Sequence, residues 1–290
     1  MRSLLFVPGH DPRKLAKGLE SAADALILDL EDAVPEAEKA RARALCADFV
    51  AQHHQQKKLI VRVNALATGW LLDDLAVVVR AQPFAVMLPK CTGAKDVALV
   101  GHYLSALEKR DALAPGLVRI FAIATESAES LFETRSYQDA GARLAGLMWG
   151  GEDLAADIGA TANRDAEGHY TAPYQLARTL TLLGATSAGV AAIDAVYTNF
   201  RDADGLRAEC ADALRDGFSG KAAIHPDQVA VINAAFSPSE ADLTWARRVL
   251  AAFDAQPAAG AVALDGRMLD RPHYRSAQRV LARAGVAVAA

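Results

Sequence analysis

Short apolar runs alternate with longer amphipathic segments from the start of the chain to about residue 236. Apolar runs bounded by turn-forming residues predict buried strands, and apolar residues three and four apart predict helices. The predicted strands are Leu4–Val7, Ala25–Leu30, Leu59–Val63, Ala85–Leu88, Val118–Ala124, Leu144–Trp149, Val190–Ile193 and Ala222–Ile224. The predicted helices include Pro12–Ala22, Glu36–Gln52, Leu71–Ala81, Ala94–Lys109, Tyr174–Gly184 and Leu206–Arg215.

This strict alternation of strand and helix indicates an α/β fold with parallel strands joined by right-handed crossovers. Eight strands are the number that closes a (β/α)8 TIM barrel. We therefore expect residues 1–236 to form such a barrel rather than an open, doubly wound sheet. In a barrel of this kind the active site lies at the carboxyl ends of the strands.

Polar and charged residues gather where the predicted strands end. In chain order the ends carry Pro8-Gly9, Asp29 to Asp32, Arg62 to Asn64, Pro89-Lys90, Glu126, Glu152-Asp153, Asp194 and His225-Pro226. Polar loops are common in any fold, but turns alone do not require a mixture of acids with one arginine and one lysine. Because the carboxyl ends of barrel strands meet at one rim, we expect these residues to form a common site.

Two of these acids are the metal-ligand candidates. Glu126 follows the strand that ends at Ala124-Thr125, and Asp153 follows Gly150-Gly151-Glu152. Carboxylates that meet at one rim can bind a hard cation such as Mg²⁺, which prefers oxygen ligands. The alternative is that each acid caps the helix that follows it, because acids are favoured at helix N-termini.

The alternation stops after residue 236, and we expect residues 237–290 to form a helical C-terminal extension. Ser239 predicts the N-cap of a helix that reaches Phe253, residues 256–261 form a linker of small residues, and a final amphipathic helix spans His273–Ala284. Such an extension packs on the barrel or covers a barrel mouth, either its own or that of a neighbouring subunit.

Composition narrows the class of protein. The 290 residues carry a formal net charge of -4 with no block of lysine or arginine, which argues against nucleic acid and membrane partners and favours a small-molecule substrate. The chain has no apolar run of the roughly 20 residues that span a bilayer, and its first residues do not form a secretory signal. Cys46, Cys91 and Cys210 are few and widely separated, as expected for reduced thiols in a cytoplasmic protein.

Seven short motifs lie along nearly the whole chain. They are Arg2 to Gly9, Leu28 to Val34, Val61 to Asn64, Leu88 to Lys90, Ala124 to Ser127, Gly150 to Leu154 and Ser219 to Pro226. Together they resemble the citrate lyase β-subunit family within the HpcH/HpaI aldolase and citrate lyase superfamily, whose members include malyl-CoA and citramalyl-CoA lyases. The resemblance implies a Mg²⁺-dependent lyase, and we expect a homo-oligomer, either a trimer or a hexamer.

The resemblance also implies roles for individual residues. Glu126 and Asp153 match the family's Mg²⁺ ligands, and Arg62 matches the arginine that binds a substrate carboxylate. Asp270 matches an aspartate that reaches the active site of a neighbouring subunit in the malyl-CoA lyase-like members. Its presence favours a relative that acts on CoA thioesters.

Further matches concern the thioester carrier. Phe6, Lys17 and the pair Ile224-His225 match positions along the carrier's path in the CoA lyases. Asp11 departs from the pattern, because the CoA lyases have an arginine there near the carrier's phosphates. Read without the resemblance, His225 before Pro226 is more typical of a histidine that fixes a loop than of a proton shuttle.

The chemistry that the resemblance implies is a retro-aldol cleavage. A 3-hydroxy-3-carboxyacyl thioester breaks between its carbinol carbon and the thioester α-carbon, which gives a 2-oxoacid and an enolate that becomes acetyl-CoA on protonation. Arg62 offers a planar fork for the substrate carboxylate, and peptide N–H groups from Gly151 through Glu152 to Asp153 can bind the same group. Asp270 is the candidate general acid.

Two roles are open to each of three other rim residues. Glu31 and Asp32 can act in catalysis by orienting water or accepting hydrogen bonds near the metal, or they can cap the helix that starts near Glu36. Lys90 can contact substrate or form a structural ion pair in the barrel mouth.

Two other functions fit the same residues. One is a metal-dependent aldolase for free 2-oxoacids, which the presence of Asp270, Phe6 and Lys17 argues against. The other is an assembly subunit of a multi-chain citrate lyase that acts on a carrier-protein thioester. The intact pair Glu126 and Asp153 argues against a catalytically inactive subunit.

Overall fold

Eight parallel strands form a closed barrel, in which β8 pairs with β1 to complete the ring. The strands are β1 (Ser3–Pro8), β2 (Ala25–Asp29), β3 (Lys58–Arg62), β4 (Ala85–Leu88), β5 (Arg119–Ile123), β6 (Leu144–Met148), β7 (Ala191–Asp194) and β8 (Gly220–Ala223). The predicted TIM barrel is confirmed, and all eight predicted strands are present with ends shifted by a residue or two. The computed structural model describes residues 1–257 and 259–286.

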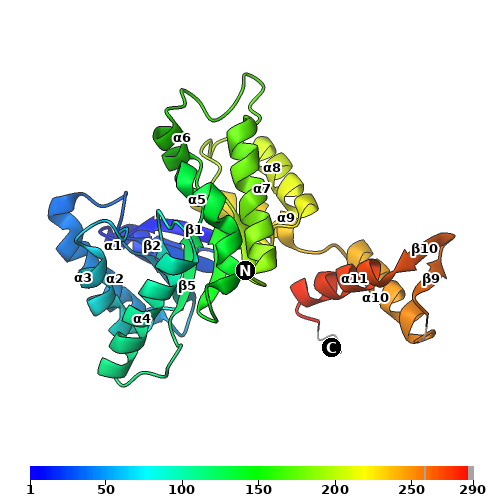
Figure 1. The fold of residues 1–290 in the computed structure, drawn as a ribbon, viewed down its shortest axis with the longest axis horizontal. Helices are drawn as coiled ribbons and strands as arrows, with labels where there is room; N and C mark the ends of the chain where they lie inside the picture. The colour runs from blue at the N-terminus through cyan, green and yellow to red at the C-terminus, as the bar shows by residue number, and fades with distance from the viewer. Residues whose placement is uncertain (258, 287–290) are drawn as a thin grey trace. The chain divides into compact units, whose positions relative to one another are not determined.

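Helices lie around the strands (Figure 1). They are α1 (Pro12–Glu20), α2 (Lys39–His53), α3 (Leu71–Val78), α4 (Ala94–Arg110), α5 (Ala128–Glu133), α6 (Glu152–Ile158), α7 (Ala172–Ser187), α8 (Ala203–Asp216) and α9 (Pro226–Phe236), with short 3₁₀ turns η1 (Glu36–Glu38), η2 (Val79–Ala81) and η3 (Thr134–Asp139). Across the described residues, no helix is both long enough and apolar enough to cross a membrane.

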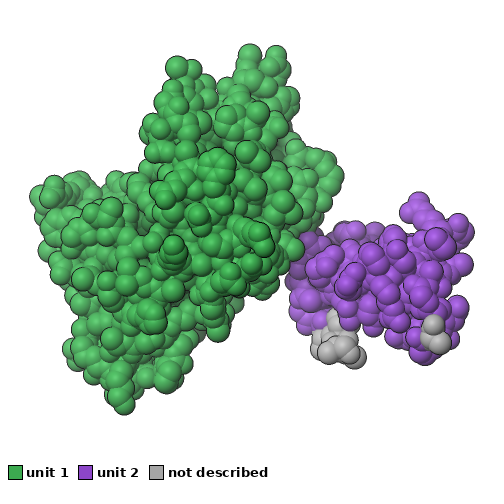
Figure 2. Space-filling model, in the orientation of Figure 1, with its two compact units in different colours: residues 1–233 green, residues 234–290 purple. Residues whose placement is uncertain are grey.

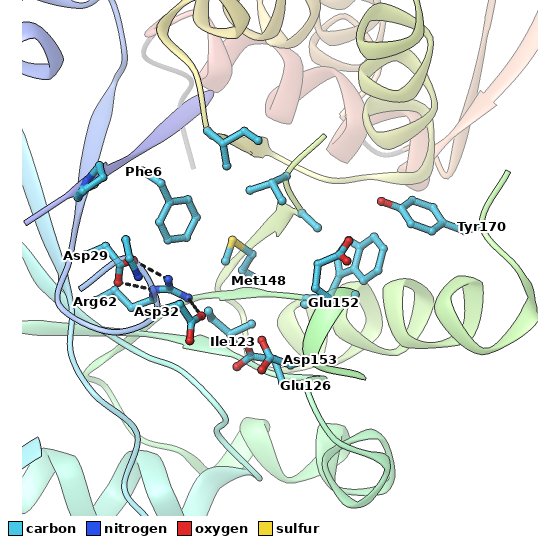
Figure 3. Close-up of a pocket in the computed structure, with 18 residues that line it drawn as sticks. Phe6, Asp29, Asp32, Arg62, Ile123, Glu126, Met148, Glu152, Asp153 and Tyr170 are labelled. Carbon is cyan, nitrogen blue, oxygen red and sulfur yellow. Dashed lines mark hydrogen bonds and ion pairs between the residues drawn. The ribbon is translucent and has the colours of Figure 1, made fainter. Parts of the chain in front are cut away.

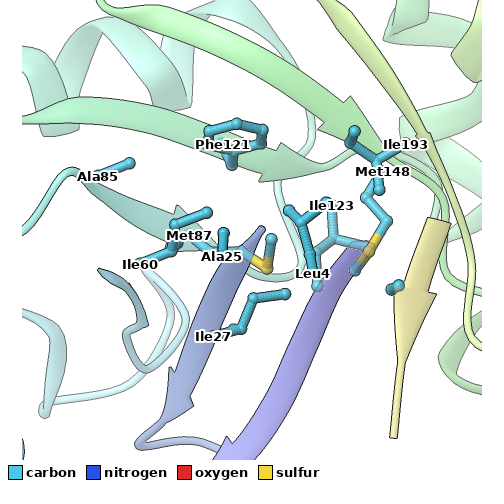
Figure 4. Close-up of a cluster of buried hydrophobic side chains, with 11 residues drawn as sticks. Leu4, Ala25, Ile27, Ile60, Ala85, Met87, Phe121, Ile123, Met148 and Ile193 are labelled. Atoms are coloured by element: carbon cyan, nitrogen blue, oxygen red, sulfur yellow. The ribbon is translucent and has the colours of Figure 1, made fainter. Parts of the chain in front are cut away.

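The barrel interior is filled by alternate residues of the strands, because successive side chains of a strand point to opposite faces. Ala25 and Ile27 of β2 and Phe121 and Ile123 of β5 belong to one buried apolar cluster (Figure 4). A Cβ at Gly146 of β6 would overlap the Phe121 ring, so the ring uses the space that a side chain there would need. The interior is therefore a packed core below the rim where the strands end.

Residues 234–290 form a second compact unit, which Figure 2 colours separately from residues 1–233. It contains α10 (Glu240–Asp254), β9 (Ala261–Leu264), β10 (Arg267–Asp270) and α11 (Arg271–Arg283). The two predicted helices are present, and Ser239 caps α10 as expected. Ala258 of the predicted linker and residues 287–290 of the predicted extension lie outside the described residues.

The antiparallel hairpin of β9 and β10 was not predicted. Its turn residues Asp265 and Gly266 have φ values of 50° and 73°. Positive φ at both central residues is typical of a two-residue hairpin turn, for which Asp-Gly between alternating apolar residues is the strongest sequence signal. The sequence therefore held a signal for the hairpin that the helical reading of this region overlooked.

Candidate active site

A cavity of about 450 Å³ opens at the carboxyl ends of the strands, a size typical of small-molecule sites. Phe6 of β1, Arg62 of β3, and Glu126 and Asp153 beyond β5 and β6 contribute to its wall (Figure 3). The complete lining is Phe6, Pro8, Asp29, Asp32, Ala33, Arg62, Ile123, Glu126, Met148, Trp149, Gly150, Gly151, Glu152, Asp153, Tyr170, Ala195, Val196 and Ile224. Five of the eight predicted strand ends, those that follow β1, β2, β3, β5 and β6, therefore meet in one cavity, whereas Lys90, Asp194 and His225 are not part of its lining.

Glu126 lies just beyond β5 and is only 5% exposed. Its carboxylate accepts a hydrogen bond from the backbone N–H of Lys90. Burial, together with the negative charges of Asp153 and Glu31, raises the pKa of Glu126 to about 8. A Cβ at Gly150 would lie 2.7 Å from the Glu126 Cγ, so glycine is needed there for this side chain to occupy its position.

Asp153 belongs to the first turn of α6, directly after the paired glycines. It is close enough to raise the pKa of Glu126 through charge repulsion, and the two carboxyl groups appear together in Figure 3. The neighbouring Glu152 also lines the cavity and accepts a hydrogen bond from Asn163 Nδ2 at 2.9 Å. Ser127, not Glu126, caps α5, so the capping alternative does not explain the position of Glu126.

These donors fit Mg²⁺. Both are carboxylates, the ligand type that this ion prefers, and Mg²⁺ is usually bound through one or two carboxylates while it keeps several waters. Among the described residues, no group of three or more His, Cys, Asp or Glu side chains is arranged to hold a metal. The site would therefore offer two protein ligands and leave the other coordination positions to water and substrate. This arrangement suits Mg²⁺ better than it suits a metal ion that requires protein ligands at every position.

Arg62 is held by three acids. Its Nε and one terminal nitrogen each donate to a different oxygen of Asp29 at 2.7 Å, and the other terminal nitrogen lies 2.9 Å from Glu31 and 3.1 Å from Asp32. The guanidinium also lies 5.1 Å from the centre of the Phe6 ring. Although burial lowers it, hydrogen bonds and charge from Asp29 raise the pKa of Arg62 above its ordinary value. A substrate carboxylate would have to share or replace one of these partners.

Lys90 completes a small charge network at the rim. Its ammonium group lies 2.5 Å from Glu31 Oε1, 3.3 Å from Asp153 Oδ1 and 3.7 Å from Asp32 Oδ1. Burial raises the pKa of Glu31 despite the positive charges of Arg62 and Lys90. Glu31 and Asp32 make no cap for the turn at Glu36, where Pro35 occupies the N-cap position.

The residues matched to a carrier path divide into two groups. Phe6 and Ile224 line the cavity, whereas Lys17 is exposed on α1 and His225 stacks on Phe200 with ring centres 4.8 Å apart. Neither Lys17 nor His225 lines the cavity. Asp11 caps α1 by accepting hydrogen bonds from the backbone N–H groups of Arg13 and Lys14, which accounts for an acid at this position.

Asp270 lies in the second unit at the start of α11. Its carboxylate is 2.6 Å from Nδ1 of His273, and this hydrogen bond lowers the pKa of Asp270. In this environment Asp270 is ionised at neutral pH, which suits a proton acceptor. As a general acid it would need surroundings that raise its pKa.

Three polar or aromatic residues of the cavity were given no role in the site from the sequence. Asp29 was noted as a strand end, but its pairing with Arg62 depends on the register of β2 against β3, which places the two residues opposite each other. Trp149 was predicted as the last residue of a strand, and its ring forms part of the wall. Tyr170 comes from the loop before α7, where no motif marks it, and packs edge-on against Trp149.

Comparison with known proteins identifies the family. Residues 2–226 match the family model described as HpcH/HpaI aldolase/citrate lyase. The chain is 37% identical over 288 residues to a (3S)-malyl-CoA thioesterase of Cereibacter sphaeroides, covering 98% of this chain and 94% of that protein. It is 33% identical over 297 residues to the mitochondrial citramalyl-CoA lyase of Rattus norvegicus, and the match covers 97% of this chain and 85% of that protein.

A solved structure is also similar over the full length. It is the CitE protein of Mycobacterium tuberculosis in complex with magnesium, acetoacetate and coenzyme A, which matches with a TM-score of 0.79 and 36% identity over 98% of both chains. The family match runs from the first barrel strand to the start of α9. This chain therefore belongs to the HpcH/HpaI aldolase/citrate lyase family.

Proposed function

We propose that the protein is a Mg²⁺-dependent carbon–carbon lyase that cleaves a 3-hydroxy-3-carboxyacyl thioester of the citramalyl-CoA, malyl-CoA or citryl-CoA type. The products are acetyl-CoA and a 2-oxoacid. The observation that carries the proposal is the presence of two carboxylates suited to Mg²⁺, Glu126 and Asp153, in one cavity with the guanidinium of Arg62. Relatives named for malyl-CoA and citramalyl-CoA and a similar structure bound to magnesium, acetoacetate and coenzyme A support it.

In this proposal Arg62 binds the substrate carboxylate by exchanging one partner. The side chain of Asp32 is 56% exposed, whereas those of Asp29 and Glu31 are almost fully buried. Asp32 is therefore the partner that can leave the guanidinium most easily, because water can hydrate its carboxylate once the ion pair is broken. The paired contact with Asp29 then keeps the fork in place while it contacts the substrate.

Bound by Glu126 and Asp153, Mg²⁺ would polarise the substrate oxygens and stabilise the negative charge that develops as the carbon–carbon bond breaks. The apolar wall, which includes Phe6, Ile123 and Met148, limits the access of water to this charge. Asp270 of a neighbouring subunit, ionised at neutral pH, is proposed to accept the proton of the substrate hydroxyl and then to donate it to the α-carbon of the enolate, which gives acetyl-CoA.

The test is an assay of the purified full chain with Mg²⁺ and citramalyl-CoA, malyl-CoA or citryl-CoA, in which the 2-oxoacid, acetyl-CoA and free thiol are measured separately. We expect chelator-sensitive release of 2-oxoacid and acetyl-CoA in equal amounts from at least one substrate. Asp153→Ala should lose this activity, whereas Asp48→Ala, which removes an exposed acid on α2, should retain it.

Each other outcome points to a different function. Free thiol without 2-oxoacid would indicate thioester hydrolysis, the reaction for which the Cereibacter relative is named. Cleavage of free hydroxy acids without a thioester would favour the 2-oxoacid aldolase. Activity restored only by an acyl-carrier thioester or partner chains would favour a citrate lyase subunit, and cleavage that survives chelation would contradict the Mg²⁺ mechanism.

A further inference from the structure

Lys90 touches both proposed metal ligands. It follows β4 in the segment Leu88-Pro89-Lys90 and has a φ of 51°, in the left-handed region that a lysine rarely adopts. In this conformation its backbone N–H donates to Glu126 while its ammonium group lies 3.3 Å from Asp153. A strained backbone that brings two groups of one residue to the same site is typical of a functional position.

The acidic side chains around Lys90 differ in the cations with which they form ion pairs. Arg62 pairs with Asp29, Glu31 and Asp32, and Lys90 itself lies closest to Glu31, at 2.5 Å. Within the part of the chain that the structure describes, the ion pair recorded for Asp153 is the one with Lys90. Among the described residues, the ammonium group of Lys90 is therefore the side-chain cation that forms an ion pair with a proposed metal ligand.

A cation bound to Asp153 would compete directly with that ammonium group. Mg²⁺ and an ammonium group repel each other strongly at short range in a partly buried site, where solvent screening is weak. The flexible four-carbon stem of lysine allows its charge to swing away while the backbone N–H stays on Glu126. Lys90 thus has the geometry of a cation that occupies the site reversibly.

We propose that Lys90 is the internal counter-ion of the metal site: its ammonium group neutralises Asp153 in the metal-free protein and must leave when Mg²⁺ binds. This inference rests on the proposed assignment of Glu126 and Asp153 as Mg²⁺ ligands. Lys90 therefore lowers the affinity of the site for Mg²⁺. The released ammonium group becomes available to the anionic substrate, so Mg²⁺ and substrate favour each other's binding.

The test measures the binding of Mg²⁺ alone by titration calorimetry to metal-stripped full-length protein. Lys90→Met removes the ammonium group and should bind Mg²⁺ at least about ten-fold more tightly than the wild type, because the competing charge is gone. Lys90→Gly keeps the backbone N–H donor, suits the positive φ and should show the same gain. Lys95→Met, which removes an exposed lysine on α4, should bind like the wild type.

A second measurement covers the case in which a variant is unstable without metal. The increase in melting temperature caused by Mg²⁺ should be larger in Lys90→Met than in the wild type, because Mg²⁺ then supplies the missing positive charge. Equal or weaker Mg²⁺ binding by both Lys90 variants, with the wild type binding normally, would overturn the counter-ion role and leave the proposed function intact. No Mg²⁺ binding by the wild type or either variant would overturn the metal assignment as well.

Discussion

At the scale of single residues, the site depends on the close approach of Glu126 to the backbone at Gly150. A Cβ on Gly150 would lie 2.7 Å from Glu126 Cγ and 3.2 Å from its Oε1. Such a contact is too close to be tolerated, so the flexible glutamate side chain must move. Gly150 therefore contributes by the absence of a side chain.

Gly150→Ala should weaken Mg²⁺ binding by about ten-fold or more, because moving a ligand or its support typically costs 10- to 100-fold in metal affinity. Calorimetric titration with Mg²⁺ checks this. The control is Gly69→Ala, because a Cβ at Gly69 would meet nothing within 4 Å and its φ is not positive. Unchanged Mg²⁺ affinity in Gly150→Ala would show that the contact does not position Glu126.

At the scale of elements, a buried charge network joins β7 and β8 to the helices outside them. Asp194 of β7 lies 2.7 Å from Lys221 of β8 and 3.2 Å from Arg178 of α7, and it accepts a hydrogen bond from the Trp149 indole at 2.7 Å. Lys221 also pairs with Glu209 of α8 at 2.7 Å. Because Trp149 directly precedes the glycines of the site, this network supports the wall of the cavity.

The stability of the barrel should depend on the ionisation of Asp194. Burial alone would raise its pKa, but the charges of Lys221 and Arg178 lower it below the ordinary value. Stabilisation by a carboxylate with a lowered pKa is present above its unfolded pKa of about 4 and is lost as the pH falls through the folded value. Asp194→Asn should therefore lower the free energy of unfolding at pH 7 by about 3–5 kcal/mol, the range for removing one partner of a buried ion pair.

Urea unfolding followed by tryptophan fluorescence between pH 7 and pH 3 checks this prediction. The wild type should lose more stability than Asp194→Asn as the pH decreases, so the difference between them shrinks in acid. The control is Asp48→Asn, which removes the charge of an exposed acid on α2. A pH-independent difference between wild type and Asp194→Asn would mean that the carboxylate charge is not what stabilises the network.

The barrel elements were predictable because their signals are local. A buried strand between helices of a barrel is a short, nearly continuous apolar run, and all eight such runs became strands. The hairpin of β9 and β10 was overlooked because residues 237–290 were predicted to be helical, although Asp265-Gly266 marked a turn. The charges of Asp194 and Lys221 were visible in the sequence, but their pairing was not.

At the scale of the whole molecule, the chain consists of a barrel unit and a smaller unit with its own apolar core. The apolar core of this smaller unit, residues 234–290, includes Val249 and Phe253 of α10, Leu269 of β10 and Leu281 of α11. We propose that Asp270 of this unit serves the active site of a neighbouring subunit in a homo-oligomer, either a trimer or a hexamer. In a closed symmetric assembly each copy would supply this residue to one neighbour.

Complementation tests this proposal. Asp153→Ala and Asp270→Ala should each be inactive alone, but co-expressed as mixed oligomers they should recover activity in about a quarter of the sites if partners assort at random. Light scattering on the same samples gives the oligomeric state. Mixed oligomers without activity, or a fully active monomer, would contradict a shared site.

The sequence by itself determined the elements, their order and the residues at the strand ends. The apolar periodicities that define strands and helices are set by neighbours along the chain, and parallel strands in a closed barrel must deliver their carboxyl ends to one rim. The sequence alone therefore predicts that Arg62, Glu126 and Asp153 lie in one site.

Only the tertiary structure decided which charges pair. Arg62 with Asp29, Lys90 with Asp153 and Asp194 with Lys221 are separated by 33, 63 and 27 positions along the chain, and strand register and the backbone conformation at Lys90 bring them together. The entry of Tyr170 into the cavity wall likewise follows from the path of one loop. Such contacts depend on register, barrel closure and burial, which single-sequence patterns do not encode.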